Sequence, residues 1–134
     1  MLDAGRRDIK SYVLRTGRLS KLQQSALETL SDRYCIPFQD NTLDFNAVFN
    51  NQNPVIIEIG FGMGHATVEI AERNSHINYL GIEVHPPGVG KLLSRIDSRK
   101  LSNVRIIQND AVQVLRTMIP LESLKGVHIF LPDP

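Results

Sequence analysis

The sequence predicts an α/β fold in which helices cover a parallel, doubly wound sheet. Three observations support this prediction. Short apolar runs alternate with segments of helical spacing over residues 55–134. A glycine-rich turn joins the first apolar run to a helix, and an acidic residue ends or follows each run. Because such sheets bind ligands at the carboxyl ends of their strands, these acids predict a binding edge.

Composition and length limit the classes of protein that this chain can represent. The 134 residues are 42% hydrophobic and 22% charged, which is typical of one soluble globular domain. The single cysteine, Cys35, cannot form an internal disulfide and indicates a reducing compartment. Neither a signal peptide nor an apolar run of bilayer length is visible. We therefore expect a cytoplasmic protein with no membrane segment.

The first 21 residues are basic, because they contain six lysines and arginines but only two aspartates, which gives a net charge of +4. The whole chain carries +1, so the remainder carries −3. One interpretation is an arm that binds an anionic partner such as RNA; a solvated charged terminus is the other. The candidate RNA-binding residues are Arg6, Arg7, Arg15, Arg18 and Lys21.

The elements follow in order from local patterns. Apolar residues recur at helical spacing over Ser20–Tyr34, where Ser20 is a suitable N-cap. The polar stretch Cys35–Pro54 is expected to be an irregular connection, so residues 1–54 form an arm, a helix and a linker. Residues 55–134 form the ligand-binding domain. Apolar runs predict strands at Val55–Ile59, Tyr79–Val84, Val104–Gln108 and Gly126–Leu131. Helical spacing between them predicts helices at Ala66–Arg73, Gly88–Lys100 and Ala111–Met118.

Two glycine-rich stretches punctuate this pattern. The prolines and glycines of His85–Gly90 predict a shaped loop after the second strand. The string V-I-I-E-I-G-F-G-M-G-H over Val55–His65 predicts a strand, a tight turn and a helix N-terminus. A dinucleotide fingerprint would need its third small residue at position 65, which is His65. The observed G-x-G-x-G after an acid fits S-adenosylmethionine better, since that cofactor has no pyrophosphate and carries an ammonium group. An ordinary tight turn remains the alternative.

Acidic residues stand at equivalent points of the four strand units. Glu58 lies in the first strand, and Glu83 lies in the second, 25 positions later, near the spacing suited to binding ribose hydroxyls. Asn109, Asp110 and Ala111 follow the third strand and could bind an adenine amino group, although Asp110 is also a good N-cap. Asp133 stands between two prolines that restrict its backbone, and a plain turn is the alternative. The four histidines and one cysteine show no metal-binding spacing, so we expect no metal.

These motifs together resemble the bacterial tRNA (guanine-N7-)-methyltransferase family. The similarity runs over nearly the whole chain. It covers the Ser11–Gln24 region, the E-I-G-F-G-M-G string, G-I-E-V-H with P-G-V-G, N-D-A and P-D-P. The resemblance implies a Rossmann-like S-adenosylmethionine-dependent methyltransferase fold, of which the first four strands are present. It also implies methyl transfer from S-adenosylmethionine to N7 of a guanosine in the tRNA variable loop.

The resemblance further assigns roles to individual residues. Asp133 would be the catalytic residue and would contact both cofactor and guanine. The remaining cofactor-binding residues would be Glu58, Gly60, Gly62, Gly64, Glu83, Asn109, Asp110 and Ala111. Family members continue after P-D-P with a tryptophan, basic residues and three further strands. We therefore expect the domain over residues 55–134 to be incomplete, with an exposed fourth strand.

Two other functions stay open at this point. A catalytically incomplete fragment could act only as a cofactor- or tRNA-binding module. A nicotinamide-dependent oxidoreductase is disfavoured by His65. The sequence leaves the oligomeric state, monomer or homodimer, open.

Overall fold

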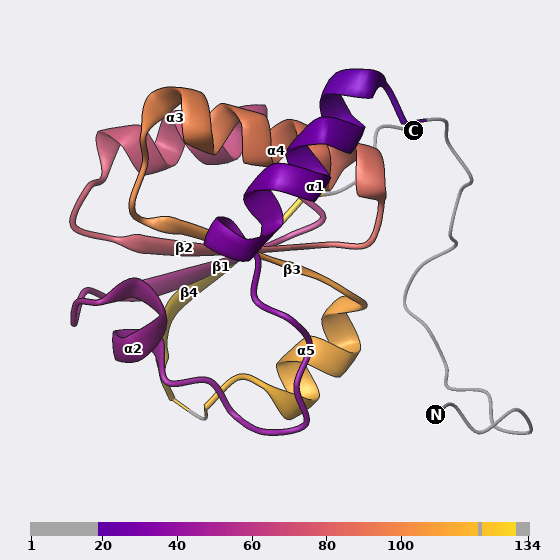
Figure 1. The fold of residues 1–134 in the computed structure, drawn as a ribbon. Helices are drawn as coiled ribbons and strands as arrows, with labels where there is room; N and C mark the ends of the chain where they lie inside the picture. Colours follow the sequence, from indigo (N-terminus) through magenta and orange to yellow (C-terminus); the bar gives the residue numbers. More distant parts are fainter. Residues whose placement is uncertain (1–18, 121, 131–134) are drawn as a thin grey trace, which may run out of the picture.

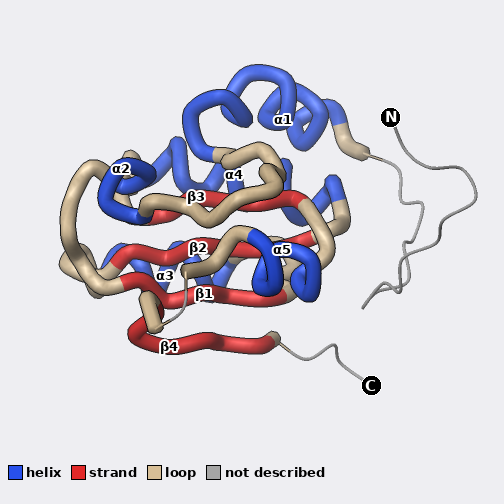
Figure 2. The backbone as a smooth tube through the Cα atoms, turned by 90° about the horizontal axis from the view of Figure 1, so that it is seen from below, coloured by secondary structure: helices blue, strands red, loops and turns tan. Residues whose placement is uncertain are grey.

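The computed structural model describes residues 19–120 and 122–130, which form a four-stranded parallel sheet in the order β3-β2-β1-β4 (Figures 1 and 2). The strands are β1 Val55–Ile59, β2 Asn78–Glu83, β3 Val104–Gln108 and β4 Leu124–Ile129. The helices are α1 Lys21–Tyr34, α2 Phe45–Phe49, α3 His65–Arg73, α4 Pro86–Arg99 and α5 Ala111–Thr117. The predicted α/β fold class with four parallel strands is confirmed.

Helices cover both faces of this sheet. Figure 1 shows α3 and α4 on one face with α1 packed against α4, while α2 and α5 lie on the other face. Two apolar clusters fill the layers. The first contains Val68, Leu92 and Ile96 under α3 and α4, and the second contains Leu80, Ile107 and Met118 near α5. These six side chains are buried, and such burial is the main favourable term in folding.

The prediction of an irregular connection over Cys35–Pro54 is wrong in one place, because α2 forms there. Asp44 caps this short helix by accepting hydrogen bonds from the backbone N–H groups of Asn46 and Ala47. Phe45 and Phe49 lie one helical turn apart and are both buried. A five-residue helix has too little periodicity to be recognised in sequence, so only its cap and burial define it.

The prediction of a shaped loop over His85–Gly90 is also wrong, since α4 already begins at Pro86. Prolines fit the first helical turn because the N–H groups they lack would have no intrahelical partner there. The other boundaries agree with prediction to within one or two residues. Ser20 caps α1 as predicted, in a capping box with Gln23.

Several predicted site residues lie outside the part of the chain that the structure describes. They are Arg6, Arg7, Arg15, Arg18 and Asp133.

Candidate functional site

Three of the predicted acids lie along the carboxyl edge of the sheet. Glu58 is the penultimate residue of β1, Glu83 is the last residue of β2, and Asp110 follows β3 by two residues. All three side chains are buried. Because the strands are parallel, the structure brings these acids to one edge, where α/β sheets bind ligands.

The strand order reverses direction at β1. From β1 the chain moves outward to β2 and β3, and it then returns to place β4 on the other side of β1. Such a reversal opens a crevice between the two strands where the order changes. In this fold those strands are β1 and β4, and Glu58 stands directly opposite His128 in their register.

Glu58 is a fully buried carboxyl group. Its Oε2 atom lies 3.3 Å from Nδ1 of His128, whose side chain is 44% exposed. Its Oε1 atom is buried and, among the described residues, has no hydrogen-bond partner. Burial, and after it the negative charge of Glu58, raises the pKa of Tyr79. A buried acceptor without a donor is rare in proteins, so Oε1 marks a position suited to a ligand donor.

The glycine turn that follows β1 holds three residues in the left-handed region. Gly60, Gly62 and Gly64 have φ angles of 69°, 63° and 77°, which glycine adopts without the penalty that a Cβ atom brings. Gly60 donates to the carbonyl of Ile82 over 2.8 Å, and Gly64 caps α3. The third glycine of the turn therefore lies one residue before the position at which a dinucleotide fingerprint has its third small residue, as the sequence predicts.

Glu83 holds the glycine turn against the end of β2. Its Oε1 atom accepts a hydrogen bond from the N–H of Gly62 over 2.9 Å. Its Oε2 atom accepts from the N–H groups of Val84 and His85 over 2.9 and 3.2 Å. A carboxylate offers about four acceptor positions, so these bonds leave about one for a ribose hydroxyl.

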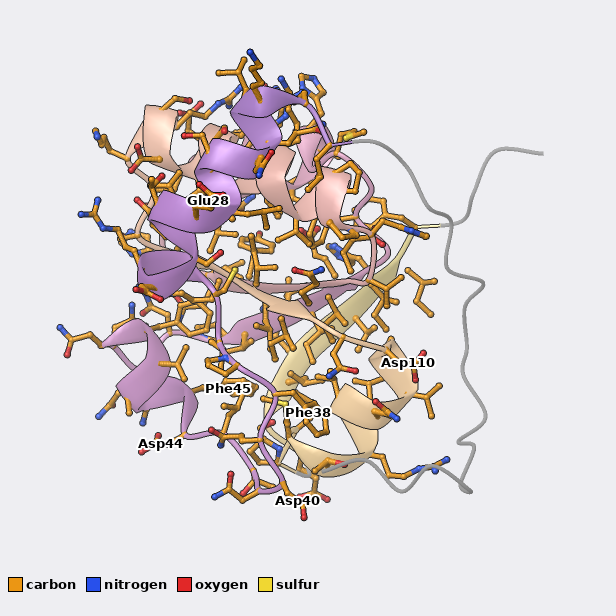
Figure 3. The ribbon with its side chains drawn as sticks, turned by 45° about the vertical axis from the view of Figure 1, so that its right-hand side comes forward. Glu28, Phe38, Asp40, Asp44, Phe45 and Asp110 are labelled. Carbon is orange, nitrogen blue, oxygen red and sulfur yellow. The ribbon has the colours of Figure 1, made fainter. Side chains whose placement is uncertain are left out.

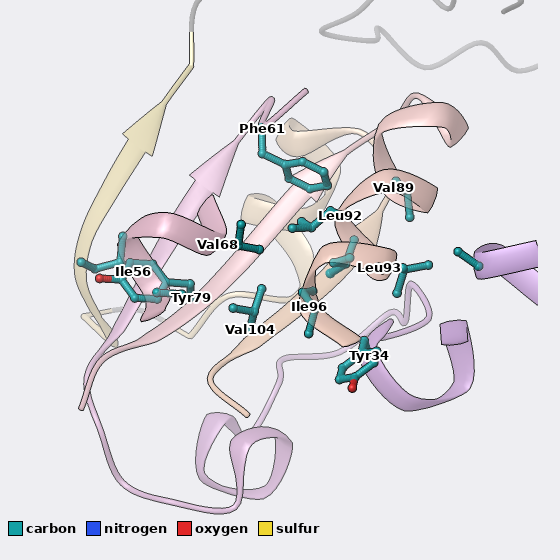
Figure 4. Packing of buried hydrophobic residues seen from close by; sticks show 13 residues of the cluster. Tyr34, Ile56, Phe61, Val68, Tyr79, Val89, Leu92, Leu93, Ile96 and Val104 are labelled. Carbon is teal, nitrogen blue, oxygen red and sulfur yellow. The ribbon is translucent and has the colours of Figure 1, made fainter. Parts of the chain in front are cut away.

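Helix α4 packs directly against the same turn. A Cβ atom at Gly88 would overlap the carbonyl oxygen of Gly62, and one at Gly64 would lie 2.6 Å from Leu92. Arg95 donates from Nε to the carbonyl of Met63 over 3.2 Å. Figure 4 shows Phe61 of the turn next to Leu92, in the core beneath. The missing side chains at Gly88 of α4 and at Gly64 of the turn therefore let the two segments approach closely.

The N-D-A motif lies at the start of α5 (Figure 3). Asp110 caps this helix and accepts a hydrogen bond from the N–H of Gln113 over 3.2 Å. Asn109 Oδ1 accepts from the N–H of Asp110 over 2.6 Å, and Ala111 is the first helical residue. The structure thus shows the capping role that the sequence also allowed for Asp110.

The N-terminus of α1 lies near the same edge. A Cβ atom at Gly90, in the early part of α4, would lie 2.7 Å from the backbone oxygen of Gln23. At the other end of both helices, the hydroxyl of Tyr34 donates to Asp97 over 3.1 Å. The two helices therefore run side by side in the same direction, and the exposed Lys21 at the start of α1 lies toward the carboxyl edge.

Other features lie away from this edge. A hollow of about 330 Å³ is lined by residues 43–46, residues 52–55, Pro120 and Ser123, at the amino ends of β1 and β4. None of the predicted cofactor residues lines it. In residues 19–120 and 122–130, no three His, Cys, Asp or Glu side chains gather in a way that could hold a metal ion. Within the same ranges no helix is long and apolar enough to cross a bilayer.

Three residues of this region were missed by the motif analysis. His128 contacts Glu58, Arg95 contacts the glycine turn, and Thr67 of α3 has a buried Oγ1 atom without a partner in the described chain. Only the strand order could have shown His128, because it puts residue 128 opposite residue 58.

Comparisons with known proteins agree with this arrangement. A family model described as "Putative methyltransferase" matches residues 52–134. The tRNA (guanine-N(7)-)-methyltransferase of Hydrogenovibrio crunogenus is 50% identical over 129 residues, which are 96% of this chain and 54% of that protein. The enzyme of the same description from Paraburkholderia xenovorans is 51% identical over 129 residues, covering 96% of this chain and 50% of that protein. The chain therefore spans about half the length of the curated relatives it matches.

A solved structure shares the fold. The 30S ribosomal A1408 methyltransferase from an uncultured bacterium has a TM-score of 0.54 and 19% sequence identity. The match covers 74% of this chain and 49% of that chain. The architecture over the described residues is thus the Rossmann-like fold of methyltransferases.

Proposed function

This chain belongs to the methyltransferase family whose model matches residues 52–134, and from that premise we propose that it acts in methyl transfer from S-adenosylmethionine to N7 of a guanosine in the tRNA variable loop. The single observation that carries the proposal is the buried, unpartnered Oε1 of Glu58, one strand residue before the glycine turn. A carboxylate in that place can accept hydrogen bonds from the ammonium group of the cofactor, whereas it has no donor for the oxygens of a pyrophosphate. The identity of about 50% to tRNA (guanine-N(7)-)-methyltransferases supports the choice of substrate.

The residues at the carboxyl edge fit this cofactor. In the proposal Glu58 takes the ammonium group, and the turn from Gly60 to Gly64 lets the backbone approach the aminoacyl end. Glu83 accepts from a ribose hydroxyl at its remaining acceptor position. The segment Asn109–Ala111 supplies polar groups for the adenine amino group.

The proposed chemistry needs positioning more than acid–base catalysis. S-adenosylmethionine supplies an electrophilic sulfonium methyl group when bound. Guanine N7 carries a lone pair and no proton, so the transfer needs no strong general base. Alignment of two reactants can contribute about 7–11 kcal/mol at best. We assign the guanine-holding role to Asp133, whose carboxylate would accept hydrogen bonds from guanine N–H groups and favour the positive charge that develops on the purine.

The position of α1 supports a role for the basic arm in binding tRNA. Lys21, at the start of α1, lies toward the carboxyl edge that holds the proposed cofactor site. In the proposal Lys21, Arg6, Arg7, Arg15 and Arg18 contact tRNA phosphates. Their substitution should weaken tRNA binding and reduce its salt dependence. Action on tRNA would place the protein in the cytoplasm.

Two measurements on the 134-residue chain test the proposal. Calorimetry should show binding of S-adenosylhomocysteine and none of NAD. Tritiated methyl groups should then pass from S-adenosylmethionine to tRNA transcribed without modifications, at N7 of guanosine. Binding without transfer would support the alternative function of a cofactor-binding module. Binding of NAD alone would exclude both functions.

A further inference from the structure

One contact of the candidate site that the proposed function does not use joins Glu58 to His128. The two residues stand opposite each other in the parallel pairing of β1 with β4, where the strand order reverses. Nδ1 of His128 lies 3.3 Å from Oε2 of Glu58. A carboxylate only accepts hydrogen bonds, so in the state in which Glu58 binds a cation, His128 would donate to it from Nδ1.

The two oxygens of Glu58 have different environments. His128 contacts Oε2, whereas Oε1 is buried and lacks a partner in the described chain. The hydroxyl oxygen of Thr67, in the first turn of α3, is also buried and lacks a hydrogen-bond partner among residues 19–120 and 122–130. In the sequence, Glu58 precedes the glycine turn and Thr67 follows it. A buried acceptor without a hydrogen bond is unfavourable, and functional sites are one of the few places where proteins retain such an acceptor.

We propose that His128 is a positioning residue that holds Oε2 of Glu58, so that Oε1 stays available to the ammonium group of S-adenosylmethionine. This inference rests on the proposed function. Among the described residues, His128 provides the one hydrogen bond that the Glu58 side chain makes. Without that donor, the carboxylate can rotate and no longer presents one oxygen in a fixed position.

Access to Oε1 requires a local movement. The atom has less than 1 Å² of exposed surface. The glycine turn follows Glu58 after one residue, and the Gly62–Glu83 hydrogen bond holds it to β2. In the proposal, a shift of this neighbouring turn gives the ligand access to Oε1. His128 would keep the carboxylate in place during the shift, because β4 is not part of the turn.

Binding of two ligands to the full 134-residue chain separates this role from general stabilisation. S-adenosylhomocysteine contains the ammonium group, whereas 5′-methylthioadenosine has the same nucleoside and no aminoacyl end. The variants are His128→Phe and His128→Leu, which remove the donor, and His128→Asn, whose amide nitrogen replaces Nδ1. His76→Leu is the matched control, since His76 is exposed and precedes β2 at the opposite edge of the sheet. Thermal melting shows which variants are folded.

We expect both donor-free variants to bind S-adenosylhomocysteine about tenfold more weakly, which corresponds to about 1.4 kcal/mol. Their affinity for 5′-methylthioadenosine should stay within twofold of the parent chain. His128→Asn and His76→Leu should retain both affinities. Equal losses for the two ligands, or no loss in either donor-free variant, would overturn the inference while leaving the proposed function intact. A parent chain that binds neither ligand would instead count against the proposed function.

Discussion

The backbone N–H of Gly62 donates a hydrogen bond to Oε1 of Glu83 over 2.9 Å, so one carboxylate joins the glycine turn after β1 to the end of β2. The same carboxylate accepts from Val84 and His85. It is therefore a structural acceptor before any ligand arrives. A ribose that used both hydroxyls would have to displace one of these three N–H donors, because about one acceptor position remains.

Glu83→Ala should destabilise the fold by about 1–3 kcal/mol, since three backbone donors at a largely buried position would lose their acceptor. Urea unfolding measures this loss directly. Glu28→Ala is a suitable control, because Glu28 is exposed on α1 and bonds only the side chain of Gln24 in the described structure. Equal stability of the two variants would show that the Glu83 carboxylate does not hold the turn.

Gly88→Ala tests the close approach of α4 to the glycine turn. Alanine favours a helix over glycine by about 1 kcal/mol. At Gly88, however, the added Cβ atom would overlap the backbone oxygen of Gly62, and overpacking costs about 1–3 kcal/mol or more. We expect a net loss of stability of about 1–2 kcal/mol, because a backbone atom cannot rotate away as a side chain can.

The control for Gly88→Ala is Gly126→Ala in β4. No heavy atom lies within 4 Å of the Cβ position there. Glycine inside a strand is unfavourable by about 0.5–1 kcal/mol relative to alanine, so this variant should be neutral or slightly more stable. Chemical denaturation of both variants tests the packing argument, and a stabilised Gly88→Ala chain would contradict it.

The contact between α3 and α4 should make stability depend on pH. Arg99 donates to Glu69 over 2.8 Å and to Glu72 over 3.2 Å. The hydrogen bond from Arg99, and next its positive charge, lowers the pKa of Glu69 below the ordinary 4.5. A carboxyl group with a lowered pKa in the folded state stabilises the fold above its unfolded pKa. That contribution is lost as the pH falls through the folded pKa.

The stability difference between the parent chain and Arg99→Gln should therefore be largest near pH 7. It should shrink as the pH falls below about 4.5, and it should also shrink in high salt because these groups lie at the surface. Arg73→Gln is the matched control, since Arg73 lies 3.9 Å from Glu69 and is 79% exposed. A difference that is constant between pH 3 and pH 7 would rule out the ion pair as its source.

Local patterns were sufficient to predict part of this structure. The cap at Ser20, the glycine turn and the acids at the carboxyl edge each depend on residues close together in sequence. The pairing of Glu58 with His128 could not be predicted in the same way, because it needs β4 to lie beside β1. The bonds that occupy Glu83 likewise depend on how the turn folds back over β2.

The open side of β4 gives the last prediction. Among the described residues β4 pairs only with β1, and the predicted exposure of its side chains is confirmed for Val127 and Ile129, which are 44% and 65% exposed. An exposed apolar edge strand offers unpaired backbone groups to a second copy of the chain. Ile129→Lys should therefore reduce self-association, since an edge lysine opposes strand pairing.

Sedimentation velocity over a concentration series measures this effect. We expect that the edge of β4 mediates self-association of the 134-residue chain and that its onset concentration rises about tenfold in Ile129→Lys, because a buried charge at the strand interface disfavours pairing. A parent chain that stays monomeric over the whole series would contradict this prediction. Leu22→Lys provides the comparison, since Leu22 is 78% exposed and lies on the helix α1 instead of on β4. If both lysine variants shifted the transition equally, general charge repulsion would explain the result. A shift confined to Ile129→Lys would assign the association to the edge of β4.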